Sequence, residues 1–175
     1  HSVKKILRAK YKVGLNQYKP VEIENLYKDL NTVEDERLYS EALGKAITLL
    51  RNEKALLPLK PESSLAHIAL GDDSSDAFKR QLQKYASIEL INKVTAQNVL
   101  EKTKTHDTLI VSFHRSNATP WKASDFNKEE LKIITSLSKT KTLILDLFVK
   151  PYALKPLENI HGIDAILMSY QNSEE

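Results

Sequence analysis

The chain has no cysteine, and among its 175 residues there are only four glycines, one tryptophan and one methionine. Without cysteine it can form no disulfide, no cysteine-ligated metal site and no thiol nucleophile. No apolar run reaches the roughly 18 residues that a membrane-spanning helix needs, so we expect no membrane span. The absence of cysteine does not fix the compartment, because it suits a periplasmic protein and a cytosolic protein alike.

The chain also lacks a strong charge of either sign. The formal net charge is +3, and lysine and glutamate are interspersed along the sequence. A nucleic-acid surface needs a basic stripe, so we expect no nucleic-acid partner. The histidines at 67, 106 and 161 are scattered, and none has a second ligand at metal-binding spacing on one helix. We therefore expect no metal and no cofactor.

The first fifty residues have helical patterns. Apolar residues recur at helical spacing at Val3, Ile6, Leu7 and Tyr11. They predict an amphipathic helix that ends near Gly14. Residues 15–31 are interpreted as an extended linker. Thr32 followed by Asp35 is typical of a helix start, and apolar spacing extends this second helix to about Arg51.

From residue 65 onward, short apolar runs alternate with helical patterns. One short helix is predicted from Thr95 to about Lys102, and Asn127 with Glu130 forms a capping box that opens another helix. Five runs predict strands, at residues 65–71, 87–91, 107–113, 142–148 and 163–168. Nearly continuous apolar runs are typical of parallel strands that are covered on both faces, and their alternation with helices predicts βαβ crossovers. We therefore predict an α/β fold, a three-layer sandwich around a mostly parallel open sheet of the flavodoxin-like type, preceded by helices.

The domain division follows from these patterns. Residues 1–31 form a helix and linker, and residues 32–175 form the α/β domain. The last strand lacks the helix that would normally follow it, so we expect the chain to be part of a longer protein. An open strand edge in such a sheet invites self-association of the chain.

A polar loop follows the most strongly apolar strand and contains the candidate substrate-binding residues His114, Arg115, Asn117 and Trp121. Ligands of open parallel sheets bind beyond the carboxyl ends of the strands. Tryptophan can stack on a sugar face, and arginine and asparagine can bind hydroxyl groups. Alternatively, Trp121 packs back on the protein, and Arg115 and Asn117 brace the loop or a neighbouring domain.

Two other strand ends carry carboxylates. Gly71 is followed by Asp72 and Asp73, whereas a phosphate cradle needs glycine-rich backbone without negative side chains. Nucleotide binding is therefore not expected there. Cation binding or phosphoryl transfer to an aspartate stays open beside the simpler interpretation of a capped helix start. Asp146 lies among leucines and Phe148, so burial is expected to raise its pKa, and we interpret it as structural rather than catalytic.

Several segments together resemble glycoside hydrolase family 3. Residues 46–59 resemble the hallmark opening of the second domain in that family. Residues 150–154 and 165–170 are similar to a Pro-Tyr turn and a late strand of the same domain. Residues 3–11 resemble the last helix of the preceding catalytic barrel. Residues 18–31 resemble the interdomain linker of the bacterial β-N-acetylglucosaminidase branch, so residues 1–31 would be barrel-terminal helix and linker.

The resemblance implies that the parent protein is a retaining glycosidase of carbohydrate metabolism, a β-N-acetylhexosaminidase. Retaining hydrolysis needs a carboxylate nucleophile and a separate acid/base, and in this branch both lie in the barrel. The chain would then be a non-catalytic domain without catalytic residues of its own. Its partner would be the catalytic barrel of the same parent chain, through which it would meet the carbohydrate substrate. In the family's glucosidase branch a glutamate of the second domain is the acid/base, but no glutamate here is placed on a matching position.

For the parent we favour the periplasm or cell envelope of a bacterium over the cytoplasm. A second hypothesis, from a different class, is a stand-alone flavodoxin-like module for ligand binding or signalling. Binding of a nucleotide or phosphate-like ligand at Asp72 and Asp73 would favour it.

Overall fold

The computed structural model describes residues 1–60, 64–116, 121 and 125–170. The chain divides into two compact units, His1–Glu41 and Ala42–Glu175. No helix within the described residues is long and apolar enough to cross a bilayer.

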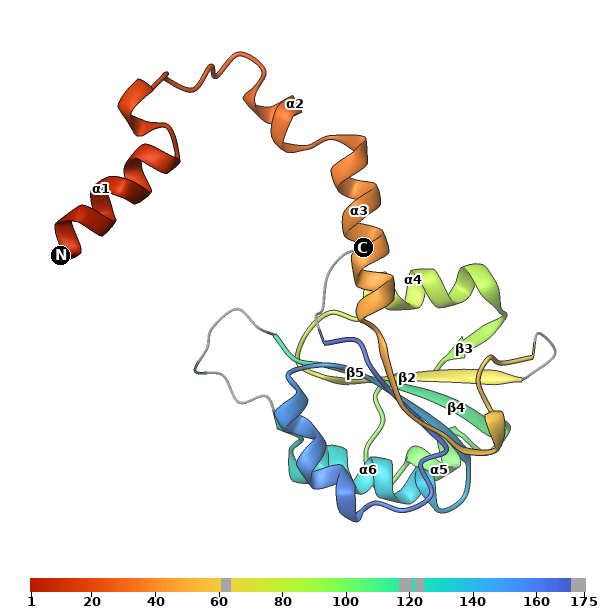
Figure 1. Ribbon diagram of the computed structural model, residues 1–175. Helices are drawn as coiled ribbons and strands as arrows, with labels where there is room; N and C mark the ends of the chain where they lie inside the picture. The colour runs from red at the N-terminus through yellow and green to blue at the C-terminus, as the bar shows by residue number, and fades with distance from the viewer. Residues whose placement is uncertain (61–63, 117–120, 122–124, 171–175) are drawn as a thin grey trace. The chain divides into compact units, whose positions relative to one another are not determined.

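The first unit is helical and has no interior. It contains helix α1 (Ser2–Lys12), the short 3-10 helix η1 (Leu15–Gln17), α2 (Leu26–Leu30) and most of α3 (Val33–Ala46) (Figure 1). None of residues 1–41, all of which the structure describes, is buried. The predicted apolar stripe of α1 is present but between 55% and 71% exposed at Val3, Ile6, Leu7 and Tyr11. Because an isolated helix this short is marginal in water, α1 needs a cover that its own unit does not supply.

The predicted start of α3 is confirmed, and its predicted end is wrong. The Asp35 N–H donates to Thr32 Oγ1 at 3.1 Å, and the Asp35 carboxylate accepts from the Thr32 N–H at 3.1 Å. The helix ends at Ala46 rather than near Arg51, because Thr48–Asn52 forms strand β1. Helical apolar spacing continues through this stretch, but pairing with a distant strand overrides it.

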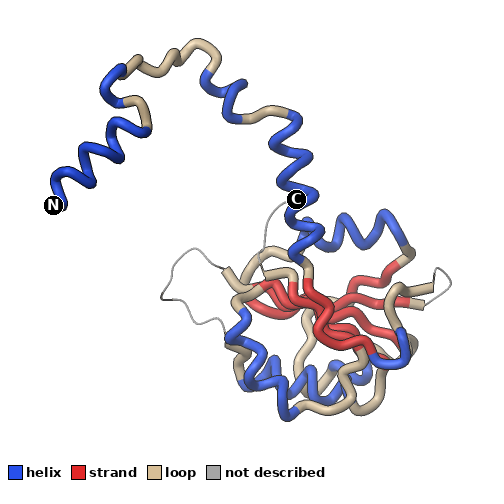
Figure 2. The backbone as a smooth tube through the Cα atoms, in the orientation of Figure 1, coloured by secondary structure: helices blue, strands red, loops and turns tan. Residues whose placement is uncertain are grey.

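Six strands form one sheet in the order β1-β6-β5-β4-β2-β3. Figure 2 shows the strands in red, with helices on both sides of them. The five predicted strands are β2 (Leu65–Gly71), β3 (Ile88–Leu90), β4 (Thr108–His114), β5 (Thr142–Phe148) and β6 (Ala165–Met168). These five are parallel, and β1 joins the edge antiparallel to β6. The parallel strands have the flavodoxin-like order, in which the second strand is an edge and the first is next to it.

Helices cover both faces of the sheet, so the predicted three-layer sandwich is confirmed. Helix α4 (Asp76–Tyr85) lies on one face, and α5 (Val99–Lys102) and α6 (Lys128–Ser138) lie on the other (Figure 1). Helix α5 is shorter than the 95–102 that the sequence predicts. The 3-10 helix η3 (Pro151–Asn159) replaces the turn expected after β5 and adds Ala153 and Leu157 to the core beneath α6.

Alternate residues of each central strand enter the two cores. The larger core, on the α6 face, includes Val111, Phe113, Ile134, Leu137 and Leu145, all fully buried. The smaller core, on the α4 face, includes Leu65, Ile110, Ile144 and Ala165 with Phe78 and Leu82 of α4. A fully buried leucine or isoleucine side chain contributes about 2 kcal/mol relative to an exposed one, so these two layers hold the strands in register.

Candidate functional site

The register of the sheet places Gly71, His114 and Phe148 side by side at the carboxyl ends of β2, β4 and β5. The strand order reverses between β2 and β4, and this switch point is where doubly wound sheets bind ligands. Here a main-chain hydrogen bond connects the two strand ends: the Asp72 N–H donates to the His114 carbonyl at 3.0 Å. Gly71 has a φ of +103°, and a Cβ at this position would overlap the same carbonyl oxygen.

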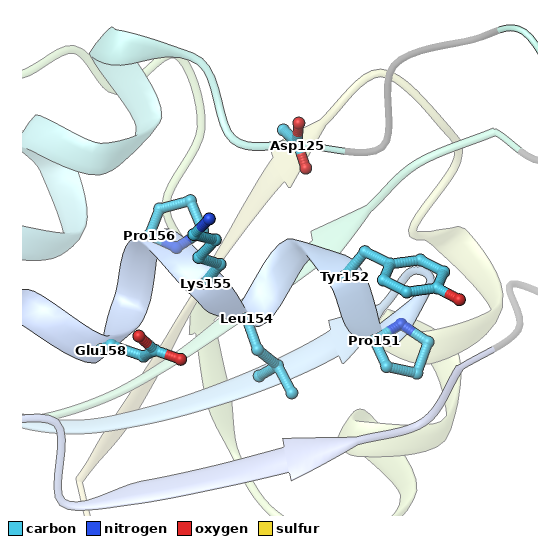
Figure 3. A pocket seen from close by; sticks show the side chains of 7 residues that line it. All are labelled: Asp125, Pro151, Tyr152, Leu154, Lys155, Pro156 and Glu158. Carbon is cyan, nitrogen blue, oxygen red and sulfur yellow. The ribbon is translucent and has the colours of Figure 1, made fainter.

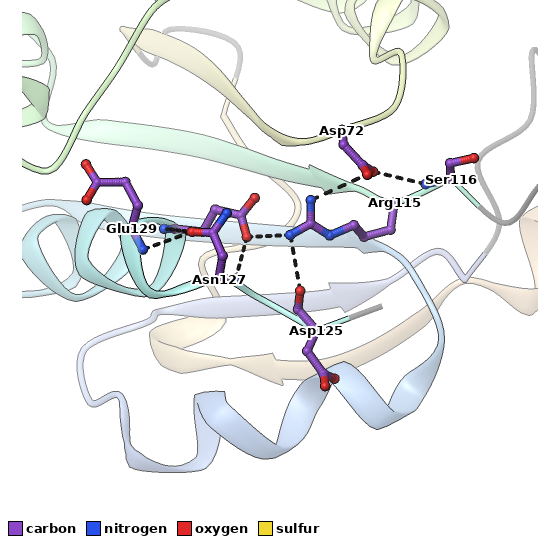
Figure 4. Close-up of polar contacts among 7 residues, drawn as sticks. Asp72, Arg115, Ser116, Asp125, Asn127 and Glu129 are labelled. Atoms are coloured by element: carbon purple, nitrogen blue, oxygen red, sulfur yellow. Dashed lines mark hydrogen bonds and ion pairs between the residues drawn. The ribbon is translucent and has the colours of Figure 1, made fainter. Parts of the chain in front are cut away.

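Arg115 ties three segments together at this edge (Figure 4). Its Nη2 donates to Glu130 Oε2 at 2.7 Å and to the Asp125 carbonyl at 3.1 Å. Its Nη1 lies 3.7 Å from Asp72 Oδ1, and its guanidinium lies 4.8 Å from the centre of the Phe113 ring. The side chains of Arg115 and Glu130 are only 11% and 9% exposed. Charge-assisted hydrogen bonds of a guanidinium are strong when water is largely excluded, so Arg115 fixes the positions of its partners.

Glu130 also starts helix α6, as the sequence predicted. Its Oε2 accepts from the Asn127 N–H at 2.7 Å, and Asn127 Oδ1 accepts from the N–H groups of Glu129 and Glu130 at 2.9 Å each. The sequence pattern identified this capping box but not its link to Arg115. One carboxylate therefore serves both the helix cap and the guanidinium.

The four candidate residues have different surroundings. Asn117 lies outside the described residues. Trp121 is 92% exposed, so its ring does not pack back on the protein, whereas His114 is fully buried. Arg115 makes the contacts that the bracing interpretation expected, with the chain at Asp125 and Glu130. The structure thus brings His114 and Arg115 together at one strand end and leaves Trp121 open to solvent.

A buried polar cluster lies below this edge, on the α4 face, and sequence reasoning missed it. Ser112 Oγ is 2.7 Å from His67 Nε2 and 2.8 Å from His114 Nε2. The ring of His114 stacks on that of Phe148 with centres 4.5 Å apart, and the ring of Phe78 is next to both histidines. The spacing of Ser112 and His114 by two residues was a sequence signal that both face the same side of β4.

Burial changes the acid–base behaviour of this region. It lowers the pKa of His67 from an ordinary 6.5 to about 4, with further lowering by the charge of Lys79 and by His114. It raises the pKa of Asp146, as the sequence predicted, while the hydrogen bond from Ser169 acts in the opposite direction. The Ser169 hydroxyl donates to Asp146 Oδ1 at 2.7 Å, so Asp146 has a structural partner.

A hollow of about 510 Å³ lies between η3 and the end of the loop after β4. It is lined by Asp125, Pro151, Tyr152, Leu154, Lys155, Pro156 and Glu158. Figure 3 shows Asp125 across from η3, which carries the other lining residues. The ring of Tyr152 is 83% exposed. An open aromatic ring with carboxylates and an ammonium group nearby is suited to a polar, ring-shaped ligand such as a sugar.

The described residues contain no group of three or more His, Asp or Glu side chains that could hold a metal ion. The histidines that do come together, His67 and His114, both direct Nε2 to a serine hydroxyl.

Comparison with known proteins gives matches in structure only. No protein family's sequence profile matches the chain, and no curated protein matches it in sequence. The β-glucosidase from Listeria innocua in complex with isofagomine matches 97% of this chain with a TM-score of 0.70 at 17% identity. The β-glucoside phosphorylase BglX matches 94% with a TM-score of 0.63 at 17% identity. The chain shares its fold with part of these enzymes.

The matched part is a minor share of each neighbour. The chain spans 28% of the Listeria innocua enzyme and 32% of BglX. A third match, with a TM-score of 0.59 and 15% identity over 89% of this chain, covers 18% of a structure described as a GCN5-related glucosamine N-acetyltransferase region in a fungal multi-domain GH3 β-N-acetylglucosaminidase. At these identities the likeness shows the fold alone.

Proposed function

We propose that the chain is the non-catalytic second domain of a retaining family 3 glycoside hydrolase that acts on N-acetylglucosaminides. One observation carries the proposal: 97% of this chain superimposes on only 28% of a β-glucosidase. Such coverage is expected when the chain corresponds to one domain of a larger glycosidase. The resemblance of residues 46–59 to the opening of the family's second domain supports the same assignment.

The geometry of residues 46–59 suits a structural join between domains. Strand β1 lies in this segment and pairs with β6 at the antiparallel edge. The Asn52 side chain then brackets the following turn, donating to the Leu57 carbonyl at 3.0 Å and accepting from its N–H at 2.9 Å. The Glu53 N–H donates to the Asp164 carbonyl at 2.7 Å. The segment thus fixes the entry of the chain into the sheet.

The carboxylates at the carboxyl edge support a non-catalytic role. Retaining hydrolysis needs two carboxyl groups about 5 Å apart on either side of a sugar bond. Asp72 and Glu130 contact Arg115, and Glu130 also caps α6. Asp146 is 8% exposed and accepts a hydrogen bond from Ser169. Each of these three carboxylates has a structural task, which fits a parent enzyme whose catalytic pair lies in the barrel.

Exposed apolar surface supports a partner domain. The stripe of α1 has no cover within its unit, and Leu49 and Leu50 of β1 are 50% and 47% exposed. On this proposal the catalytic barrel of the same parent chain covers such surface. The hollow at Tyr152 and the exposed ring of Trp121 then supply sugar-binding groups at the rim of the parent's site. We propose that the parent lies in the periplasm or cell envelope of a bacterium rather than in the cytoplasm.

The specificity is tested with the parent protein. We expect the full-length protein to hydrolyse a chromogenic N-acetyl-β-glucosaminide faster than the matching β-glucoside. The resemblance of residues 18–31 to the N-acetylglucosaminidase linker supports this substrate preference. The structural neighbour from Listeria innocua is, by contrast, a β-glucosidase. The opposite preference would overturn the specificity, and a parent without a barrel would overturn the whole proposal.

The flavodoxin-like strand order favours a second candidate, a stand-alone module for ligand binding or signalling. Its ligand would enter at the switch point near Asp72 and Asp73. There the Asp72 N–H is bonded to the His114 carbonyl, and Asp72 Oδ1 accepts from the Ser116 N–H at 3.4 Å. Saturable binding of a nucleotide that is lost in Asp72→Ala would favour this candidate over the glycosidase domain.

A further inference from the structure

The side chains of His67, Ser112 and His114 form a buried hydrogen-bonded cluster that the proposed function does not use. His67, Ser112 and His114 are 1%, 0% and 0% exposed. They come from neighbouring strands, β2 and β4, and face α4. Both imidazoles direct Nε2 to the same hydroxyl, at 2.7 and 2.8 Å. In a buried site of this kind, the position of each proton is energetically important, because an unpaired polar group has no access to bulk water.

Only three proton arrangements satisfy both short contacts with neutral imidazoles. The serine hydroxyl has one proton, so it cannot donate to both rings. Either His67 donates to Ser112, which donates to His114, or the sequence of donation is reversed. In the third arrangement both rings donate to Ser112, and the hydroxyl proton needs another acceptor. In the described part of the chain, Ser112 Oγ has no hydrogen-bond partner other than the two rings.

The second nitrogen of His67 distinguishes the remaining two arrangements. Among the described residues, His67 Nδ1 is buried without a hydrogen-bond partner. If it carried a proton, an N–H donor would be buried without an acceptor, which is unfavourable. If it carries none, His67 Nε2–H donates to Ser112, and only an imidazole lone pair lacks a partner. Donation from His67 through Ser112 to His114 is therefore favoured.

We propose that His67 and Ser112 are positioning residues that hold His114 in its Nδ1–H tautomer, because His114 Nε2 is occupied as the acceptor of the Ser112 hydroxyl. His114 is the last residue of β4 and precedes Arg115, which ties the loop ends. The cluster thus fixes which ring nitrogen of His114 carries the proton, next to the start of the strand-end loop. Its relevance to a sugar site rests on the proposed function, whereas the tautomer does not.

A proton added to either ring disrupts the donation from His67 through Ser112 to His114. A doubly protonated His114 no longer accepts from Ser112, so the serine hydroxyl must turn to a partner that the described cluster does not offer. The ionisable groups around the cluster are Lys79 of α4, itself paired with Asp76 at 3.3 Å, and Asp146, which is next to Ser112 in the register of β5. The Lys79 charge opposes a second positive charge in the cluster.

The tautomers are measured by long-range proton–nitrogen NMR on the complete 175-residue chain with ¹⁵N-labelled histidine near neutral pH. We expect His67 to show a pyridine-like Nδ1 and a pyrrole-like Nε2, and His114 to show the reverse. Exposed His161 is the internal reference, because its two nitrogens should show exchange-averaged shifts. A pyrrole-like Nδ1 in His67, or averaged shifts in both buried rings, would overturn the proposal.

Two matched variants test the direction of donation. In His67→Gln the side-chain amide can still donate to Ser112, so His114 should keep its single tautomer. In His67→Leu no donor remains, and the His114 shifts should move toward the averaged values of His161. Equal His114 shifts in both variants would overturn the positioning role. If a variant does not fold, the tautomers measured in the wild-type protein still test the proposal. A parent without glycosidase activity would refute the proposed function and leave these tautomers unchanged.

Discussion

Replacing His67 with glutamine should change how the stability of the protein depends on pH. The imidazole is 1% exposed, and burial lowers its pKa to about 4, against 6.5 for the ordinary group. The unfolded chain therefore binds a proton more readily than the folded chain. Stability is lost as pH falls from about 6.5 to about 4, and this loss is absent when residue 67 cannot titrate.

The magnitude follows from the difference between the two pKa values. A shift from 6.5 to about 4 corresponds to a full loss of about 3 kcal/mol, at about 1.4 kcal/mol per pKa unit. About 2 kcal/mol of this is already lost near pH 5. Asp146 acts in the opposite direction, because its raised pKa lets the folded chain bind a proton first, so stability rises as pH falls through that pKa. Asp146 is present in both wild type and His67→Gln, so its contribution cancels when the stability of one is subtracted from that of the other.

Urea unfolding near pH 7.5 and near pH 5 measures the effect. His67→Gln should be less stable than wild type at the higher pH, and the gap should narrow by about 2 kcal/mol at the lower pH. The variant His161→Gln is a control for the substitution itself, because the position is exposed; near pH 7.5 it should be about as stable as wild type. Parallel curves for wild type and His67→Gln would refute the conclusion that a neutral, buried imidazole is kept at position 67.

Substitutions at three further positions test the carboxyl edge by urea unfolding. Gly71→Ala should lose about 2 kcal/mol or more, because φ is +103° and the new Cβ overlaps the His114 carbonyl; unchanged stability would show that the two strand ends can separate. Arg115→Met should lose about 3 kcal/mol, because it leaves the Glu130 carboxylate buried without its cation, and a loss below about 0.5 kcal/mol would show that the pair is solvated. Asn127→Ala should lose about 1 kcal/mol through the α6 cap, whereas Asn127→Asp, which keeps the acceptor, should lose less; equal losses would argue against the cap.

Local patterns identified the regular elements. The strand expected at residues 142–148 has the same bounds in the structure, and Asn127 and Glu130 form the capping box that their spacing predicts. Strand β1 was missed because Ala46, Ile47 and Leu50 fit a helical period. The competing interaction, pairing with β6, joins residues more than a hundred positions apart and has no local signal.

The polar contacts of the site were predicted less well for the same reason. His67 and Ser112 meet only because β2 and β4 are neighbours in the sheet, and strand order cannot be read from spacing. Glu130 was recognised as a cap, but its contact with Arg115 depends on how α6 begins beside β4. The sequence did place His114 and Arg115 at a strand end, where the structure puts them.

Turnover of a chromogenic N-acetyl-β-glucosaminide by the 175-residue chain alone is the most direct test of its non-catalytic role. We expect a rate equal to that of buffer, because Asp72, Glu130 and Asp146 each have a structural partner. Hydrolysis that is abolished by Asp146→Asn, in a variant that keeps the unfolding midpoint of wild type, would show that the chain carries catalytic chemistry of its own.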